Sequence, residues 1–139
     1  RLDARFLAAE GLFKGPFGWF LHRVGGIPVG EGRASLVDDA AAAFAAADEM
    51  VLVISPEGTR RRVEVWKSGF WRIADAAGVP VVIGRVDGAA KTVAIGPAVR
   101  IDGDTRAVME AAREFLDGAG GLRPHNAGPV AIADEVRDS

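Results

Sequence analysis

The residues best suited to chemistry in this sequence stand together in one short loop. Residues 51–54 read Val-Leu-Val-Ile, an uninterrupted apolar run that is typical of a strand buried on both faces of a parallel sheet. A proline then ends the strand, because it has no N–H to donate, and Gly58 allows the chain to bend. Glu57, Thr59 and Arg60 are therefore predicted just past the carboxyl end of a buried strand, where open α/β sheets bind ligands.

Positive charge gathers in and after this loop. Arg60, Arg61 and Arg62 are consecutive and Lys67 follows them, in a chain whose formal net charge is −2. An arginine can engage two phosphate oxygens at once, so the loop is predicted to bind a phosphomonoester. The alternative is a strand-ending turn with a solvated basic rim, since most charge runs are solvated surface.

The elements that must position this loop alternate between helix and strand. Residues 35–50 are predicted to form an alanine-rich helix that leads into the buried strand. Residues 65–77 are predicted as a second helix, with Gly78 at its C′ position and an apolar strand at residues 79–83 after it. This alternation predicts an α/β fold, with a mostly parallel sheet flanked by helices.

The last third of the chain adds shorter elements. Residues 91–95 and 98–101 are predicted as two short strands at the sheet edge, separated by Gly-Pro. Residues 105–117 form an amphipathic helix in this interpretation. Residues 119–139 are rich in Gly, Pro and charge and are predicted as a loosely ordered C-terminal tail, so that one domain covers residues 1–118.

Composition excludes several classes of function. The chain has 139 residues, 49% of them hydrophobic, which supports one compact domain, and its pI near 5.7 is unlike that of a nucleic-acid binder. Cysteine is absent, which excludes disulfides and thiolate zinc sites, and no cluster of metal ligands is visible, so no metal is implied. We find no nucleophile elbow and no glycine-rich nucleotide loop, and no apolar stretch reaches the ~20 residues of a spanning helix.

Three sequence blocks carry a resemblance to a known family. The Pro-Glu-Gly-Thr-Arg block at residues 56–60 resembles that of the glycerolipid acyltransferases that acylate 1-acylglycerol-3-phosphate. Gly-Gly-Ile-Pro-Val at residues 25–29 and Trp-Lys-Ser-Gly-Phe at residues 66–70 are also similar to blocks of this family, in the same order. This chain differs from the family after Gly-Gly-Ile-Pro-Val. In the family this block is usually followed by Asp-Arg, whereas here Glu31 stands at the arginine position and Arg33 comes two residues later.

The resemblance implies a fold similar to that of this family and a reaction. A fatty acyl group would pass from acyl-CoA or acyl carrier protein to a lysophospholipid acceptor, above all 1-acylglycerol-3-phosphate, in phospholipid biosynthesis. Arg60 would bind the acceptor phosphate, Gly58 would let the backbone approach, Glu57 and Thr59 would hold the loop or the glycerol moiety, and Lys67 would be a second phosphate ligand. The acyl donor is a substrate, so no bound cofactor is implied.

The family's general base is not found in this sequence. That base is a histidine followed five positions later by an aspartate, but Ile27 follows His22 at this spacing and Val130 follows His125. Since the motif lies upstream in related sequences, we expect this chain to begin after it and to be inactive alone. A non-catalytic lipid- or phosphate-binding relative is the main alternative. A different general base and a phosphate-ester hydrolase are the less favoured ones.

Clustered aromatic residues near the N-terminus have two interpretations. In one interpretation they form a short helix of the core. In the other they form an apolar surface that meets the membrane, since clustered aromatic residues suit a membrane interface. The two interpretations are compatible if the helix lines a groove for the acyl chain. We expect a cytoplasmic protein attached peripherally to the membrane, without a nucleic-acid partner. The residues concerned are Phe13, Phe17, Trp19 and Phe20.

Overall fold

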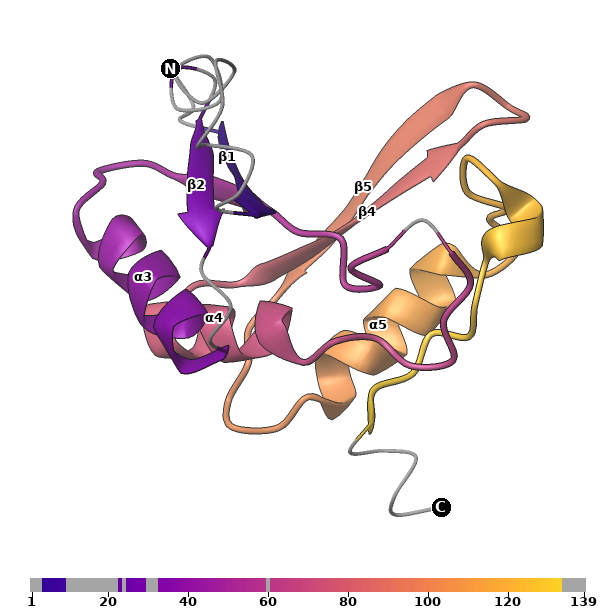
Figure 1. Ribbon diagram of the computed structural model, residues 1–139. Helices are drawn as coiled ribbons and strands as arrows, with labels where there is room; N and C mark the ends of the chain where they lie inside the picture. The colour runs from indigo at the N-terminus through magenta and orange to yellow at the C-terminus, as the bar shows by residue number, and fades with distance from the viewer. Residues whose placement is uncertain (1–3, 10–22, 24, 30–32, 60, 134–139) are drawn as a thin grey trace. The chain divides into compact units, whose positions relative to one another are not determined.

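The computed structural model describes residues 4–9, 23, 25–29, 33–59 and 61–133 (Figure 1). The chain divides into two compact units, Arg1–Ile54 and Ser55–Ser139. Each unit is a mixed α/β structure with its own small sheet. The assignment of residues 1–118 to one acyltransferase-like domain stays a prediction.

The first unit holds a three-stranded sheet in the order β2-β1-β3. Its strands are β1 (Ala4–Ala9), β2 (Gly26–Val29) and β3 (Val51–Val53), and both neighbouring pairs are parallel. Helix α3 (Arg33–Ala45) contacts β2 and buries Ala40 completely. The helix before β3 and the parallel strands confirm the predicted α/β class for this part of the chain. The helix begins and ends earlier than the predicted residues 35–50.

The predicted burial of β3 on both faces is wrong. Val51 is 40% exposed and Val53 is 62% exposed, so only Leu52 between them is partly covered. The physical reason is the strand's place, because β3 is an outer strand of this sheet and pairs with β1 on one side only, among the described residues. The apolar run at residues 51–54 therefore indicated a strand correctly but did not indicate burial on both faces.

The second unit is built on an antiparallel hairpin, which corrects the prediction of one mostly parallel sheet. Strand β4 (Val81–Asp87) pairs with β5 (Thr92–Val99), and Figure 1 shows helix α5 (Arg106–Leu116) lying along this hairpin. The two short strands predicted on either side of Gly-Pro are one strand. Val82 pairs with Ala98 and Gly84 with Ile95, so that two residues of β5 oppose one of β4. This is a bulge, and a proline is tolerated there because its missing N–H is not needed for pairing.

Helix α4 (Gly69–Ala77) ends as the sequence predicts. Gly78 has φ = 65°, its N–H donates to the carbonyl of Asp75 at 3.1 Å, and Val79 N–H donates to the carbonyl of Ala74 at 3.0 Å. A left-handed residue at this position lets the last carbonyls of a helix find donors, and glycine adopts it without a Cβ penalty. Pro80 follows and stops the helix from continuing.

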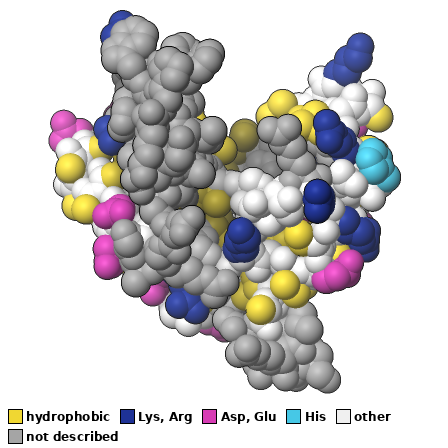
Figure 2. Space-filling model, viewed as in Figure 1, with side chains coloured by type: hydrophobic (Ala, Val, Ile, Leu, Met, Phe, Trp, Pro, Cys, Tyr) yellow, Lys and Arg dark blue, Asp and Glu magenta, His cyan; other side chains and the backbone are white. Residues whose placement is uncertain are grey.

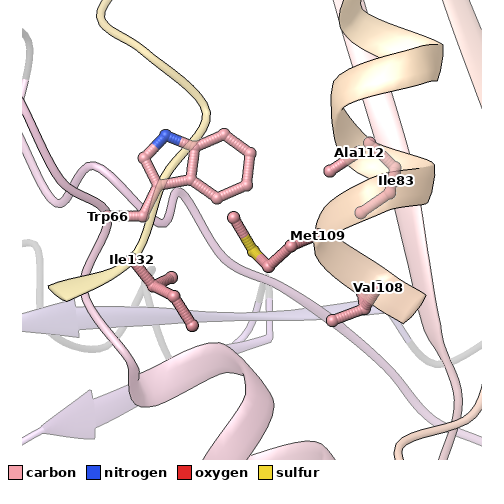
Figure 3. Packing of buried hydrophobic residues seen from close by; sticks show 6 residues of the cluster. All are labelled: Trp66, Ile83, Val108, Met109, Ala112 and Ile132. Atoms are coloured by element: carbon pink, nitrogen blue, oxygen red, sulfur yellow. The ribbon is translucent and has the colours of Figure 1, made fainter. Parts of the chain in front are cut away.

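The core of the second unit gathers residues from five segments. Met109 extends from α5 toward Trp66 and Ile132 (Figure 3), and Trp66 also meets Phe70 edge to face, with ring centroids 6.2 Å apart. Edge-to-face aromatic pairs are favourable because a positive ring edge meets a negative ring face. The buried members of this core cluster are Trp66, Ile83, Val108, Met109, Ala112 and Ile132.

The segment after α5 contacts the rest of the second unit as far as Ile132. Ile132 is 1% exposed and forms a parallel bridge with Trp66, whose N–H donates to the carbonyl of Ala131 at 2.7 Å. Arg113 Nε donates to the carbonyl of Val130 at 3.0 Å. The short 3₁₀ helix η1 (Pro124–Asn126) lies within this segment. These contacts hold part of the segment, while the loosely ordered tail at residues 119–139 stays a prediction.

Candidate functional site

The turn after β3 is fixed by backbone hydrogen bonds within the second unit. Gly58 N–H donates to the carbonyl of Ser55 at 3.1 Å, and Lys67 N–H donates to the carbonyl of Pro56 at 2.8 Å. Gly58 has φ = 65°, in the left-handed region that only glycine adopts without strain. The loop residues and Lys67 therefore share one hydrogen-bonded framework, although they are separated in the sequence.

The side chain of Lys67 lies across the face of Gly58. A Cβ added to Gly58 would stand 2.8 Å from both Cε and Nζ of Lys67, so a side chain there would displace the lysine. Lys67 itself is exposed to solvent, so its ammonium group is presented at the turn. The structure thus brings together Gly58 and Lys67, two of the residues that the sequence predicted as one site.

Thr59 holds the loop. Its Oγ1 accepts a hydrogen bond from the Arg61 N–H at 3.3 Å, which is a local side-chain turn. Glu57 is half-buried and lines the groove described below. Arg60, the residue predicted to bind the phosphate, lies outside the described residues.

The arginines beyond the loop differ in their surroundings. Arg62 Nε lies 3.2 Å from the Glu64 carboxylate, and its Nη1 donates to the carbonyl of Ala127. These contacts give Arg62 a structural role in holding the C-terminal segment, whereas Arg61 is exposed. Not all of the basic run predicted from the sequence is therefore available to a ligand.

A groove of about 680 Å³ opens on the second unit next to this loop. Ser55 and Glu57 form part of its wall, while residues 119–123 and 126–128 form another part. Figure 2 shows Lys and Arg side chains interspersed with hydrophobic ones on the right of the view. The large apolar side chains that line the groove are Trp66, Val86, Leu116, Leu122 and Val130, and the charged ones are Glu57, Arg85 and Arg123.

Arg85 is the most constrained cation of the groove. Its Nη1 donates to the carbonyl of Phe115 at 3.2 Å, and its guanidinium carbon lies 5.3 Å from the centre of the Phe115 ring. Arg123 is exposed, and its side chain makes no hydrogen bond or ion pair with the described residues. Sequence reasoning missed both arginines, because neither follows a recognisable motif and the groove is formed by segments far apart in the chain.

Several predicted features lie outside what the structure describes. Phe13, Phe17, Trp19 and Phe20 are among these residues, and so is His22. The side chain of Arg33 is likewise not described.

Other functional features are few in the part of the chain that is described. His125 is exposed in η1. Among the described residues no group of three or more His, Cys, Asp or Glu could hold a metal ion, and no described helix is long and apolar enough to cross a membrane.

Comparison with family models, with curated proteins and with solved structures gives no significant match. The function proposed below therefore depends on the sequence blocks and on the geometry of the loop.

Proposed function

We propose that this protein belongs to the glycerolipid acyltransferases and that the turn around Gly58 binds the phosphate of a lysophospholipid acceptor. The reaction would transfer a fatty acyl group from acyl-CoA or acyl carrier protein to 1-acylglycerol-3-phosphate. In this proposal the protein acts in the cytoplasm, peripherally attached to the membrane that holds its acceptor. The donor is a second substrate, and no bound cofactor is part of the proposal.

The observation that carries this proposal is the contact between Lys67 and Gly58. Gly58 belongs to the Pro-Glu-Gly-Thr-Arg block and Lys67 to the separate Trp-Lys-Ser-Gly-Phe block, and both blocks resemble the same family. The Lys67 ammonium lies at the one residue of the turn that has no side chain. Two blocks that meet in space in this way support a shared site more than a basic run on a solvated rim does.

The chemistry of the turn suits a phosphomonoester. A phosphate carries about −1.5 to −2 charges at neutral pH and accepts several hydrogen bonds. Lys67 offers an ammonium group with three donors, and in this proposal Arg60 adds a guanidinium that can engage two oxygens. Without a Cβ at Gly58, the Lys67 side chain can lie across the turn and present its ammonium group there. Glu57 and Thr59 would hold the loop or the glycerol moiety.

Binding of glycerol 3-phosphate by calorimetry tests the acceptor site without a lipid chain. We expect the wild-type chain to bind it and Lys67→Met to bind it about 5- to 10-fold more weakly, because one charge-assisted contact is lost at an exposed site. Lys91→Met is the matched control, since Lys91 is an exposed lysine at the tip of the β4–β5 hairpin. Glycerol, which lacks the phosphate, should not bind. Equal affinity of wild type and Lys67→Met would refute the proposed site.

A second candidate is a lipid- or phosphate-binding protein that does not transfer acyl groups. It is favoured by one observation, namely that neither His22 nor His125 is followed by an aspartate at the family's spacing. Both candidates share the phosphate site, so glycerol 3-phosphate binding does not separate them. Both candidates also predict no acyl transfer by residues 1–139 alone, so an assay with acyl-CoA and 1-acylglycerol-3-phosphate separates them only on a chain that also carries the histidine-and-aspartate motif.

A further inference from the structure

The groove of the second unit has walls that the phosphate turn does not use. Residues 119–123 form one of them and cross the tip of the β4–β5 hairpin, where Gly88 N–H donates to the carbonyl of Gly121 at 3.0 Å. A Cβ on Gly88 would stand 3.2 Å from Leu122 Cα, so the two backbones are in close contact. Farther along, Ile132 is buried in the core cluster against Trp66. The groove is thus held by fixed contacts at both ends of the C-terminal segment.

The apolar part of the groove is incompletely covered. Leu122 is 72% exposed and Val86 is 42% exposed, although both are large apolar side chains. Trp66, Leu116 and Val130 are more deeply placed in the same lining. An apolar ligand would remove this surface from water, which favours binding.

The charged part of the groove favours an anion. Arg85, Arg123 and Glu57 are the only charged side chains of the described lining, which leaves one positive charge in excess. A guanidinium has five N–H donors, and the hydrogen bond from Arg85 to the Phe115 carbonyl occupies one of its nitrogens. Arg123 is exposed beside the apolar surface. A ligand with an apolar body and an anionic end would match both parts.

We propose that this groove binds a single-chain amphiphile with an anionic head group. The chain would cover Trp66, Leu116 and Leu122, and the head would be bound by Arg85 or Arg123. A volume of about 680 Å³ is within the range of small-molecule sites, about 300–1,000 Å³. This inference is drawn from the groove alone and does not depend on the phosphate site at Gly58.

Fluorescence titration with cis-parinaric acid, a long-chain fatty acid, tests the inference on the full chain. Leu122→Ser removes an apolar contact and Arg123→Gln removes a charge, and both side chains are exposed, so the fold is expected to persist. We expect each change to weaken binding about 5-fold, in line with the loss of a partly buried apolar side chain or of one charged contact. Val93→Ser and Arg100→Gln are matched controls, since Val93 is 71% exposed and Arg100 is exposed, and neither lines the groove.

The pattern across variants and competitors decides the outcome. A long-chain alcohol should displace the fatty acid less well than oleate does, and a short-chain carboxylate should not displace it. Lys67→Met should bind the fatty acid like the wild type. The inference is overturned if Leu122→Ser and Arg123→Gln bind as tightly as their controls, if the alcohol competes as well as oleate, or if Lys67→Met weakens binding as much as Arg123→Gln. Loss of glycerol 3-phosphate binding alone would count against the phosphate turn and leave the groove intact.

Discussion

The Nζ and Cε atoms of Lys67 each lie 2.8 Å from the position that a Cβ on Gly58 would take. Glycine at residue 58 therefore has two effects: it allows the left-handed backbone, and it leaves space for the lysine that crosses it. The first reason affects the stability of the turn. The second determines where a positive charge is presented, so the two can be separated by experiment.

Gly58→Ala separates these two effects. The positive φ should cost about 1 kcal/mol of unfolding free energy, whereas the end of a lysine side chain can move aside with little further loss. Gly103→Ala is the matched control, since Gly103 has φ = 73° and open space where its Cβ would stand. In urea unfolding the two variants should lose similar stability. Only Gly58→Ala should also weaken glycerol 3-phosphate binding, and unchanged binding would show that the position of Lys67 is irrelevant.

Ile132→Ala tests whether the C-terminal segment is part of the folded unit. Ile132 is 1% exposed in the core cluster, so its truncation should lower the unfolding free energy by about 2–4 kcal/mol. Leu122→Ala, in the same segment but 72% exposed, should change stability by about 0.5 kcal/mol or less. Urea denaturation of the two variants provides the measurement. Similar, small effects of both would mean that the segment is loosely held, as its composition suggested.

The two faces of the β4–β5 hairpin should respond differently to the same change. Ile83 is 8% exposed in the core cluster, while Ile95 is 71% exposed on β5. Ile83→Thr buries a hydroxyl and removes packing, and should lower the unfolding free energy by about 2 kcal/mol or more. Ile95→Thr should be neutral within about 0.5 kcal/mol, since threonine suits an exposed strand position. Thermal unfolding of both variants checks the assignment of faces, which equal melting temperatures would contradict.

Local signals in the sequence predicted local structure well. Gly78 ends α4 with the left-handed conformation expected of a C′ glycine, because the signal and the structure involve the same few residues. The apolar spacing predicted an amphipathic helix at residues 105–117 for the same reason, and α5 buries Val108, Met109 and Ala112 on one face.

Features that depend on distant partners could not be predicted in this way. The strand through Pro97 is possible because β5 bulges there, with Gly96 and Pro97 opposite Ile83 of β4, and the burial of Ile132 depends on Trp66. The groove is formed by loops, whose residues have no periodicity to detect. Of the candidate site, the sequence predicted Gly58 and Lys67 as members, and their contact follows from the fold.

Arg60 and Arg62 are expected to have different roles. Arg60→Ala should weaken lysophosphatidate binding by about 10-fold or more, because a guanidinium that engages two oxygens is lost. The affinity of Arg60→Lys should lie between that of the wild type and that of Arg60→Ala. Arg62→Ala should instead lower stability, since Arg62 contacts Glu64 and the Ala127 carbonyl, and should leave binding unchanged. Calorimetry combined with urea unfolding distinguishes the two roles, and a reversed pattern would move the phosphate to Arg62.

The central claim is that a phosphomonoester binds at the turn formed by Gly58 and Lys67. A ¹⁵N-edited NMR titration of the chain with glycerol 3-phosphate tests it most directly, because each backbone amide is observed separately. We predict saturable shift changes at the amides of Gly58, Thr59 and Lys67, with little change at Gly103 and Lys91. In Lys67→Met the same changes should require about 5- to 10-fold more ligand. A titration that leaves the turn amides unshifted, or that shifts only amides of residues 119–123, would contradict the claim.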